Sequence, residues 1–312
     1  MEQLLLALRA IAETTRLRIV ALLAKGELTV GEIVQILDQS QPRVSRHLKL
    51  MGEAHLLERV QEGTLVFYRL SEAGLSQELM NCVLSLVPAD DAGFKADMVA
   101  LDTIRAERVA WAQEYFRKNA ESWDEIRSLY ISESQVEEAL LAMQGRKNIN
   151  RMLDIGTGTG RMLDVFCPYV THATGIDLSR EMLAVARANM VEKGLANAQV
   201  RQGDMYSLGV EDNSQDLIVF HQVLHFALDP LAAIKEASRA LSSDGCILIA
   251  DFAPHEEEFL RIEHAHRRLG FADEEIVGLA KSAGLQLREI KHLDGGKLQV
   301  TLWCFTKRVG KE

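Results

Sequence analysis

The sequence predicts two domains of different fold class, an N-terminal α+β domain and a C-terminal α/β domain with a doubly wound, Rossmann-like parallel sheet, joined by a helical connection. Three observations predict this arrangement. Short amphipathic segments between residues 4 and 51 are followed by a hairpin pattern at residues 56–70. Apolar strands then alternate with helices over residues 151–251. A glycine-rich loop at residues 156–160 follows the first of those strands.

Composition limits the class of protein. The 312 residues are 47% hydrophobic and 26% charged, which suits two globular cores. No apolar run reaches the length of a membrane span and no secretory signal is apparent, so we expect a cytoplasmic protein outside the membrane. The four cysteines are far apart in the sequence, which predicts buried free thiols and disfavours disulfides: Cys82, Cys167, Cys246 and Cys304.

The formal charge of −10 is unevenly distributed. Residues 1–70 contain nine Lys or Arg against eight Asp or Glu, a net charge of +1, so the rest of the chain carries −11. Within the balanced part, residues 41–50 hold three basic side chains and no acidic one. This local basic face is compatible with nucleic-acid binding by an otherwise acidic chain.

The N-terminal pattern is typical of a winged helix-turn-helix. Helical spacing of apolar residues predicts helices over residues 4–11, 14–24, 30–37 and 41–51. Gly26 stops the second helix, Ser40 is placed to cap the fourth, and Pro42 suits its first turn. The third and fourth helices, joined by a tight turn, form a helix-turn-helix. Strands at 56–60 and 65–70, with Gly63 in the turn, predict a hairpin that serves as the wing.

The outer face of the fourth helix carries the candidate DNA contacts. Val44, Leu48 and Met51 share the stripe that faces the core. The polar side chains left outside would reach bases and phosphates in a major groove, and with Arg59 of the wing they form the predicted DNA-binding set: Gln41, Arg43, Ser45, Arg46 and Lys49. The alternative is a solvated face on a protein-interaction module. The combination of helix, turn, basic helix and wing favours DNA binding.

The runs Thr14–Val20, Val44–Leu50 and Phe67–Leu70 resemble the ArsR family of bacterial winged-helix repressors, and the resemblance covers about residues 1–72. It implies a homodimer that binds double-stranded operator DNA and releases it when an effector binds. The effector is often a metal held by cysteines on the helix before the recognition helix. Thr29 and Gly31 stand at those positions here, so we expect the signal to come from elsewhere.

The connection between the domains is mostly helical. Residues 71–87 have an apolar helix pattern, which predicts a dimerisation helix behind the wing, and residues 88–93 break the periodicity as a linker. Further helices are predicted over residues 98–116, 123–130 and 134–144. We therefore expect a DNA-binding domain at 1–87, a linker and connecting helix at 88–111, and a second domain at 112–312.

The C-terminal half alternates strands and helices, as a doubly wound sheet requires. Strands are predicted over residues 151–155, 172–176, 198–202, 217–220 and 246–251, and helices over 161–166, 180–193 and 231–241. A last strand pair, 285–293 and 297–307, surrounds a turn at residues 294–296.

Carboxylates at successive strand ends indicate the ligand class. The loop has the spacing G-x-G-x-G, with Arg161 where a dinucleotide loop has its last small residue. Asp154 before the loop would repel a pyrophosphate but attract an amino group. Asp177 can accept from ribose hydroxyls, and Asp204 from an adenine amine. These residues predict a nucleoside with an amino-acid tail; the alternatives are that Asp154 caps a helix and that Asp177 forms a turn.

The same elements, over about residues 112–308, resemble class I S-adenosylmethionine-dependent methyltransferases of the small-molecule type seen in quinone biosynthesis. The resemblance implies S-adenosylmethionine or S-adenosylhomocysteine as the ligand. Asp154 and the glycine loop would hold the methionine moiety, Asp177 the ribose, and Asp204 the adenine. The cofactor-binding set that it implies is Asp154, Gly156, Gly158, Gly160, Asp177, Leu178, Gly203, Asp204, Met205 and His221.

The segment after the fourth strand, His221-Gln-Val-Leu-His225, lacks the Asn/Asp-Pro-Pro clamp of amide and base methyltransferases, so we do not expect modification of DNA bases. His221 is the candidate catalytic base, with a polar contact at the pocket rim as the alternative. His221 and His225 would share one face of a helix as metal ligands, but we expect no metal. Residues 254–270 resemble a cap over a substrate pocket.

Two hypotheses of different class follow. The first is a DNA-binding transcriptional regulator whose methyltransferase-like domain binds S-adenosylmethionine or S-adenosylhomocysteine as effector. The second is an active small-molecule methyltransferase that uses the winged helix for dimerisation or local regulation. A protein with both activities is a third possibility. An intact cofactor site agrees with each of them.

Overall fold

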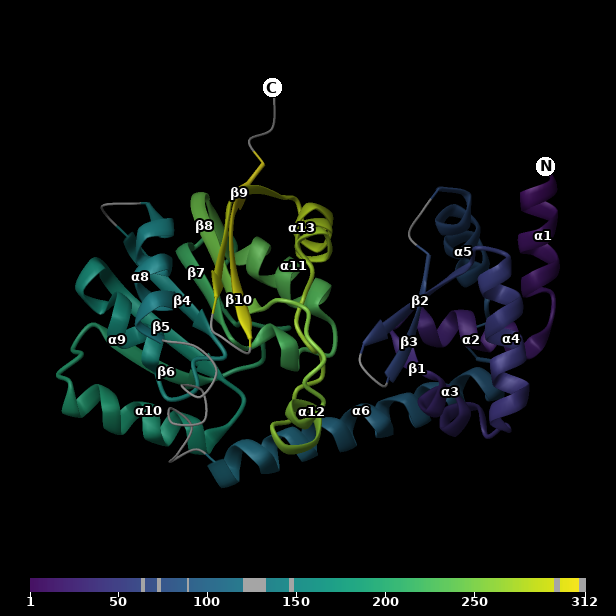
Figure 1. Cartoon of the computed structure of the whole chain (residues 1–312), viewed down its shortest axis with the longest axis horizontal. Helices are drawn as coiled ribbons and strands as arrows, with labels where there is room; N and C mark the ends of the chain where they lie inside the picture. Colours follow the sequence, from purple (N-terminus) through teal and green to yellow (C-terminus); the bar gives the residue numbers. More distant parts are fainter. Residues whose placement is uncertain are drawn as a thin grey trace. The chain divides into compact units, whose positions relative to one another are not determined.

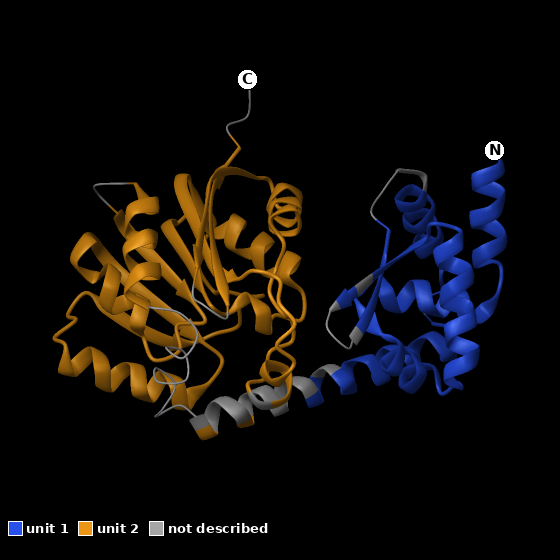
Figure 2. Cartoon of the chain, viewed as in Figure 1, with its two compact units in different colours: residues 1–110 blue, residues 111–312 orange. Residues whose placement is uncertain are grey.

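The structure is a computed structural model that describes residues 1–62, 65–71, 74–88, 90–119, 133–145, 149–294 and 298–308. Its chain divides into two compact units, residues 1–110 and residues 111–312 (Figure 2). Each unit has its own hydrophobic core. No helix among these residues is long and apolar enough to cross a membrane.

Unit 1 is the predicted winged helix-turn-helix (Figure 1). Its elements are α1 (Glu2–Ile11), α2 (Thr14–Leu23), β1 (Leu28–Thr29), α3 (Val30–Leu37), α4 (Gln41–Glu53), β2 (Leu57–Glu62), β3 (Leu65–Leu70), α5 (Gly74–Leu86) and the first part of α6 (Ala92–Asn119). The predicted helices and the hairpin are confirmed, although the turn at Gly63 lies outside the described residues. The short strand β1 was not predicted, and it pairs with β3 in a sheet of order β1-β3-β2.

The helix-turn-helix is fixed by local signals. Thr29 begins α3 with a capping box, in which its hydroxyl accepts from the Glu32 backbone N–H at 3.3 Å and the Glu32 carboxylate accepts from the Thr29 N–H at 2.8 Å. Asp38 ends α3 in the left-handed conformation with φ 50°. Ser40 is the N-cap of α4 as predicted, but its side chain makes no capping hydrogen bond. Pro42 in the first turn, with φ suited to a helix, therefore contributes more to this start than Ser40.

The connection is more helical than predicted. The helix α6 begins at Ala92 and not at Met98, because Asp91 Oδ1 accepts from the Phe94 backbone N–H at 2.8 Å and so caps its first turn. Leu101 and Ile104 of α6 are buried in the core of unit 1. The expected linker and connecting helix at residues 88–111 are thus mostly one helix, and part of that helix packs on unit 1. The helix predicted over 123–130 lies outside the described residues.

One further expectation about unit 1 changes. Cys82 is exposed on α5, whereas Cys167, Cys246 and Cys304 are buried free thiols as predicted. Met80 lies on the face of α5 that packs against the core, and Cys82 lies on the opposite face. Periodicity located the helix, but it did not show which of its faces would be covered.

Unit 2 is built on a seven-stranded sheet of order β6-β5-β4-β7-β8-β10-β9. The strands are β4 (Ile149–Ile155), β5 (Val170–Asp177), β6 (Ala198–Gln202), β7 (Gln215–His221), β8 (Leu241–Phe252), β9 (Leu285–Asp294) and β10 (Gln299–Lys307). The pairs among β4 to β8 are parallel, and β10 runs antiparallel to both its neighbours. This confirms the doubly wound fold with a closing antiparallel pair; the turn expected at 294–296 lies largely outside the described residues.

Helices cover both faces of this sheet (Figure 1). The helices are α8 (Glu133–Gln144), α9 (Arg161–Phe166), α10 (Arg180–Glu192), α11 (Pro230–Ala240), α12 (Phe259–Glu263) and α13 (Asp273–Ser282). The helices α8 and α9 share one core cluster with the sheet, and α11 and α13 share the other. The helix α13 was not predicted. Since β4 lies between β5 and β7, the strand order reverses there, and such reversals open a ligand crevice at the carboxyl ends of the strands.

Candidate functional site

The outer face of α4 is the candidate nucleic-acid surface of unit 1. Val44, Leu48 and Met51 are buried, as the periodicity predicted. All the α4 side chains in the predicted DNA-binding set are exposed: Gln41, Arg43, Ser45, Arg46 and Lys49. Lys49 lies 3.9 Å from Glu53 in an exposed i,i+4 pair that costs little to break. Arg59 is exposed on β2 of the wing and donates to the Gln61 side chain at 3.3 Å.

The glycine loop lies at the switch point of unit 2. Gly156, Gly158 and Gly160 have φ of 69°, 53° and 83°, which explains why these positions are glycine. A Cβ at Gly156 would also lie 2.2 Å from Val223 Cγ2, so the loop packs directly against the segment that follows β7. Gly160 is the N-cap of α9. The alternative that Asp154 caps this helix is therefore wrong.

The carboxylates of Asp154 and Asp177 support this loop from two neighbouring strands. Asp154 is buried in β4, and its Oδ2 accepts from the Thr157 hydroxyl at 2.6 Å. Asp177 ends β5, and its two oxygens accept from the Gly158 and Ser179 backbone N–H groups at 2.9 and 2.8 Å. Burial raises the pKa of the Asp177 carboxyl, and these backbone N–H groups partly offset that effect. The turn-forming alternative for Asp177 is thus realised together with its contact to the loop.

The third carboxylate follows β6, the next strand. Asp204 is exposed, and its Oδ1 accepts from the Tyr206 backbone N–H at 3.0 Å. Gly203 donates to the Asp177 carbonyl oxygen at 3.0 Å, which ties this segment to the end of β5. Met205 is partly buried beside it, and Leu178 is exposed after Asp177. Adjacent strand ends therefore bring Asp154, Asp177 and Asp204 to one edge of the sheet.

This set of acceptors fits a nucleoside with an amino-acid tail. Each Asp177 oxygen accepts one backbone N–H, and a carboxylate oxygen has capacity for a second donor such as a ribose hydroxyl. Asp204 is exposed, so its carboxylate is accessible to a further donor. The positive φ of the three glycines lets the backbone turn tightly at the end of β4, beside these carboxylates. The arrangement agrees with the ligand predicted from the sequence.

The segment after β7 differs from the helix considered in the sequence. His221 is the buried last residue of β7, and His225 lies in a short 3₁₀ helix, Leu224–Phe226, so the two do not share a helical face. Between them Gln222 has φ 51°, and its N–H donates to the Ala250 carbonyl oxygen at 2.8 Å. The catalytic role assigned to His221 stays a prediction.

A buried His–Asp pair, missed from the sequence, lies at this end of the sheet. The ring nitrogen Nδ1 of His225 is 2.7 Å from Oδ1 of Asp251, and both side chains are almost fully buried. Asp251 also accepts from the His225 backbone N–H at 3.2 Å and from the Phe252 N–H at 2.8 Å. The available signal was the position of Asp251 near the carboxyl end of an apolar strand, the same signal that identified Asp177.

Two more imidazoles surround this pair. The His266 ring stacks on the His225 ring with centroids 4.0 Å apart, and His255 lies against Phe252. Burial lowers the pKa of His255 to about 4, and burial with the neighbouring His225 lowers the pKa of His266 well below its ordinary value. Groups of three or more His, Cys, Asp or Glu with the geometry of a metal site are absent from the described residues.

Acidification is expected to destabilise unit 2. His255 is neutral in the folded chain down to about pH 4 and titrates near 6.5 when unfolded, so its contribution to stability is complete above about pH 6.5 and is lost as pH falls toward 4. His266 acts in the same direction. Urea unfolding at about pH 7.5 and about pH 5 measures how much the free energy of unfolding falls on acidification. The fall should be smaller in His255→Gln than in wild type, and in the control His172→Gln, which changes an exposed histidine, it should equal that of wild type. Equal losses in all three proteins would contradict this.

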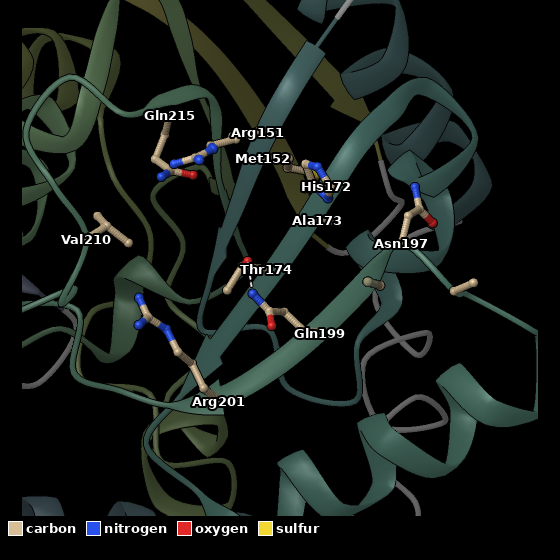
Figure 3. A pocket seen from close by; sticks show the side chains of 12 residues that line it. Arg151, Met152, His172, Ala173, Thr174, Asn197, Gln199, Arg201, Val210 and Gln215 are labelled. Atoms are coloured by element: carbon tan, nitrogen blue, oxygen red, sulfur yellow. Dashed lines mark hydrogen bonds between the residues drawn. The ribbon is translucent and has the colours of Figure 1, made fainter.

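A hollow of about 520 Å³ lies elsewhere on unit 2 (Figure 3). It is lined by residues early in β4 and β5 and by polar side chains that include Arg151, His172 and Arg201. None of the predicted cofactor residues lines it. We therefore assign the candidate site to the carboxyl edge of the sheet and not to this hollow.

Two family models match the chain. The model described as "Bacterial regulatory protein, arsR family" matches residues 13–59, which contain α4. The model described as "Methyltransferase domain" matches residues 153–249, which contain the glycine loop and the three carboxylates.

Curated relatives and solved structures match each unit separately. The transcriptional repressor SdpR of Bacillus subtilis is 30% identical over 83 residues, covering 27% of this chain and 91% of that protein. The uncharacterized methyltransferase YcgJ of Bacillus subtilis is 37% identical over 122 residues, covering 38% of this chain and 47% of that protein. The chain likewise spans about half the length of several other curated relatives that it matches. A chain from the solved complex between the Haloferax volcanii Trm112 methyltransferase activator and a methyltransferase has the same fold, with a TM-score of 0.51, 19% identity, and coverage of 60% of this chain and 96% of that one.

Proposed function

We propose that this chain, which belongs to the bacterial arsR family of regulatory proteins and carries a methyltransferase domain behind its winged helix, is a dimeric, DNA-binding transcriptional regulator whose effector is S-adenosylmethionine or S-adenosylhomocysteine. The observation that carries the proposal is the position of Asp154, Asp177 and Asp204 at one edge of the sheet, where Asp154 and Asp177 contact the glycine loop of unit 2. Such a protein acts on operator DNA in the cytoplasm.

In this proposal the effector, S-adenosylmethionine or S-adenosylhomocysteine, binds to unit 2 and not to the winged helix of unit 1. Asp177 accepts from the ribose hydroxyls, Asp204 with Met205 contacts the adenine, and the loop with Asp154 holds the methionine moiety. Thr29, which stands where a metal sensor would have a cysteine, uses its hydroxyl to cap α3. This use of Thr29 supports the relocation of sensing to unit 2.

In unit 1, α4 enters the major groove. Arg43, Arg46 and Lys49 contact phosphates or base edges, and Arg59 of the wing contacts the adjacent backbone. The helix α6 continues across the boundary at Ala110. Near its start the buried Asp97 forms an ion pair with the partly buried Arg18 of α2, whose Nε donates at 2.6 Å. This pair anchors the connecting helix to the DNA-binding unit, which supports transmission of a ligand signal along α6.

The helix α1 supports a homodimer. Leu5, Leu6 and Leu8 are 46, 47 and 40% exposed, whereas the opposite face of α1 is buried in the core of unit 1. Three large exposed apolar side chains on a ten-residue helix form a surface that a second copy would cover. The α5 helix, predicted from the sequence as the dimer helix, packs Leu79 and Val83 against the core and leaves Leu86, at its end, 75% exposed.

A charge on α1 is expected to dissociate the dimer. Leu6→Glu would place a carboxylate in an apolar contact, where desolvation costs several kcal/mol. Light scattering after size exclusion should give the monomer mass, with DNA affinity lowered because two half-sites can no longer be bound together. The matched control Val191→Glu changes an exposed valine on α10 of unit 2 and should remain dimeric. A dimeric Leu6→Glu would exclude α1 as the interface.

The experiment that tests the proposed function is fluorescence anisotropy of the full chain on its own promoter fragment at fixed salt, titrated separately with S-adenosylmethionine and S-adenosylhomocysteine. A ligand regulates DNA binding only if it binds the DNA-competent and DNA-incompetent dimers with different affinity. A change in DNA affinity with one ligand supports the proposal and identifies the effector. Tight DNA binding that neither ligand alters would exclude an effector role.

A further inference from the structure

The buried pair His225–Asp251 is not used by the proposed regulator. Asp251 is wholly buried and accepts from two backbone N–H groups, which hold its carboxylate in one orientation. Its Oδ1 lies 2.7 Å from His225 Nδ1, and an ionised carboxylate can only accept, so Nδ1 carries the proton that it donates. In this tautomer the lone pair of Nε2 lies on the other side of the ring.

The Nε2 atom of His225 is buried without a hydrogen-bond partner among the described residues, and the same holds for Nε2 of His255 and Nδ1 of His266. Buried polar atoms are nearly always paired, so three such atoms on neighbouring imidazoles need an explanation. Burial lowers the pKa of His255 and of His266, so these two rings are neutral at neutral pH and place no positive charge beside His225. The cluster has the properties of a site that receives a polar group or a proton.

This cluster adjoins the proposed cofactor site. His225 follows β7 by four residues, and Val223 between them packs on Gly156 of the glycine loop. The partner Asp251 lies near the carboxyl end of β8, the strand beside β7. Strands β4, β7 and β8 are neighbours in the sheet, so the imidazoles border the crevice from the side opposite Asp177 and Asp204. A second substrate would approach the cofactor from this side.

We propose that His225, positioned by Asp251, is a general base that takes a proton from a phenolic methyl acceptor, so that unit 2 is an O-methyltransferase as well as a ligand-binding domain. The proposal goes beyond the regulatory function: a sensor needs only to bind its ligand, whereas a proton acceptor is needed only if an acceptor is methylated.

The step balances. The acceptor loses its hydroxyl proton to His225 Nε2, and its oxygen forms a bond to the methyl carbon of S-adenosylmethionine. The bond between this carbon and sulfur breaks, and its electron pair stays on the sulfur, which leaves S-adenosylhomocysteine. Asp251 stabilises the imidazolium that results, since its carboxylate lies in contact with Nδ1. The proton is later released to solvent.

The surroundings favour a phenol over other acceptors. Phe226 and Phe252 have ring centroids 4.1 and 5.4 Å from His225, so aromatic walls surround the base. A phenol with a pKa near 10 is almost wholly protonated at neutral pH and needs a base, whereas a thiol with a pKa near 8.5 ionises more readily without one. Both arguments point to an aromatic ring that bears a hydroxyl.

Entry to Nε2 involves the segment 254–270, predicted from the sequence as a cap. The backbone N–H groups of Arg267 and Arg268 donate to the His225 carbonyl oxygen at 3.1 and 3.0 Å, and the His266 ring covers that of His225. The cap is therefore joined to the proposed base itself. The acceptor reaches Nε2 when this segment moves away from His225.

The test uses the full chain with 4-nitrophenol as the probe, because its phenol and phenolate forms absorb at different wavelengths. With S-adenosylhomocysteine bound, at a pH where the free probe is mostly neutral, the wild-type protein should bind the probe as phenolate. His225→Gln and Asp251→Asn should not, the latter because the asparagine amide favours the wrong tautomer of His225. With methyl-labelled S-adenosylmethionine, transfer to the probe should fall by about 100-fold or more in His225→Gln. The exposed His172→Gln is the control and should match wild type.

Two measurements keep the test decisive. Affinity for S-adenosylhomocysteine, measured by calorimetry, should be unchanged in both variants, which separates loss of the base from loss of folding. If His225→Gln does not fold, ¹⁵N NMR of histidine-labelled wild-type protein should show His225 Nε2 gaining a proton when the probe binds. Wild-type protein that neither ionises nor methylates the probe, or a phenolate band retained in His225→Gln, would overturn the proposal. Such a result would leave the proposed regulatory function untouched, because the anisotropy experiment tests ligand-dependent DNA binding separately.

Discussion

Replacing Asp177 by alanine is expected to abolish the response of DNA binding to S-adenosylmethionine and S-adenosylhomocysteine, while DNA affinity without ligand stays within about twofold of wild type. The bound ligand would lose the two charge-assisted hydrogen bonds that its ribose donates to this carboxylate. At about 1.5 kcal/mol or more for each bond, the Kd should increase by roughly 100-fold or more. Calorimetry with each ligand measures this loss directly, and anisotropy on the promoter fragment measures the response.

Asp177 also supports the glycine loop, so this variant needs controls. The Gly158 and Ser179 backbone N–H groups lose their acceptor in Asp177→Ala. Asp177→Asn keeps one carbonyl oxygen as an acceptor and should have an intermediate Kd. Asp244→Ala removes the same charge from an exposed position and should leave ligand binding intact. Normal ligand affinity in Asp177→Ala would exclude this carboxylate as the ribose contact, and loss of DNA binding without ligand would contradict the separation of the two units.

Replacing both Arg43 and Arg46 by alanine is expected to weaken DNA binding by about 100-fold, with about 10-fold for Arg46→Ala alone, because each removes a contact of about 1–3 kcal/mol in the groove. If both contact phosphates, the slope of log K against log salt concentration falls by about 0.9 for each arginine, since fewer counterions are released. Anisotropy at several salt concentrations, with the promoter fragment and with unrelated DNA of the same length, measures both quantities.

The control for the arginines is a matched charge loss away from α4. Arg187→Ala removes an exposed arginine from α10 of unit 2 and should change neither the affinity nor the slope. An unchanged slope in Arg43→Ala/Arg46→Ala would mean that another face of unit 1 meets the DNA backbone. A loss of affinity for the promoter fragment alone would assign these side chains to base edges and not to phosphates.

The winged helix could be predicted from the sequence because its signals are short-range. Val44, Leu48 and Met51 are spaced at helical period, and that spacing alone identified both the buried stripe and the exposed arginines. The ion pair of Arg18 with Asp97 joins residues 79 positions apart, and no local pattern predicts it. The start of α6 was also missed, because the capping contact of Asp91 depends on a turn conformation that apolar periodicity does not report.

In unit 2 the same distinction separates the cofactor loop from the His–Asp pair. Asp154, Asp177 and Asp204 each follow or end a predicted strand, and parallel strands bring their carboxyl ends to one edge, so the three were expected together. Asp251 also lies near the end of a strand, but its role depends on its contact with His225, 26 residues away in the sequence. The ring of His266 in turn stacks on that of His225. Sequence spacing placed His221 and His225 on one helical face, whereas the chain turns between them at Gln222.

By itself the sequence determined the two fold classes, the exposed side chains of α4 and the carboxylates beside the glycine loop, because these depend on periodicity and on strand ends, which are local properties of the chain. Only the tertiary structure decided that Asp177 supports the loop through Gly158, that α1 leaves three leucines exposed, and that Asp251 orients His225. Each of these depends on which surfaces of distant elements are covered or brought into contact, and that is settled by the packing of the whole unit.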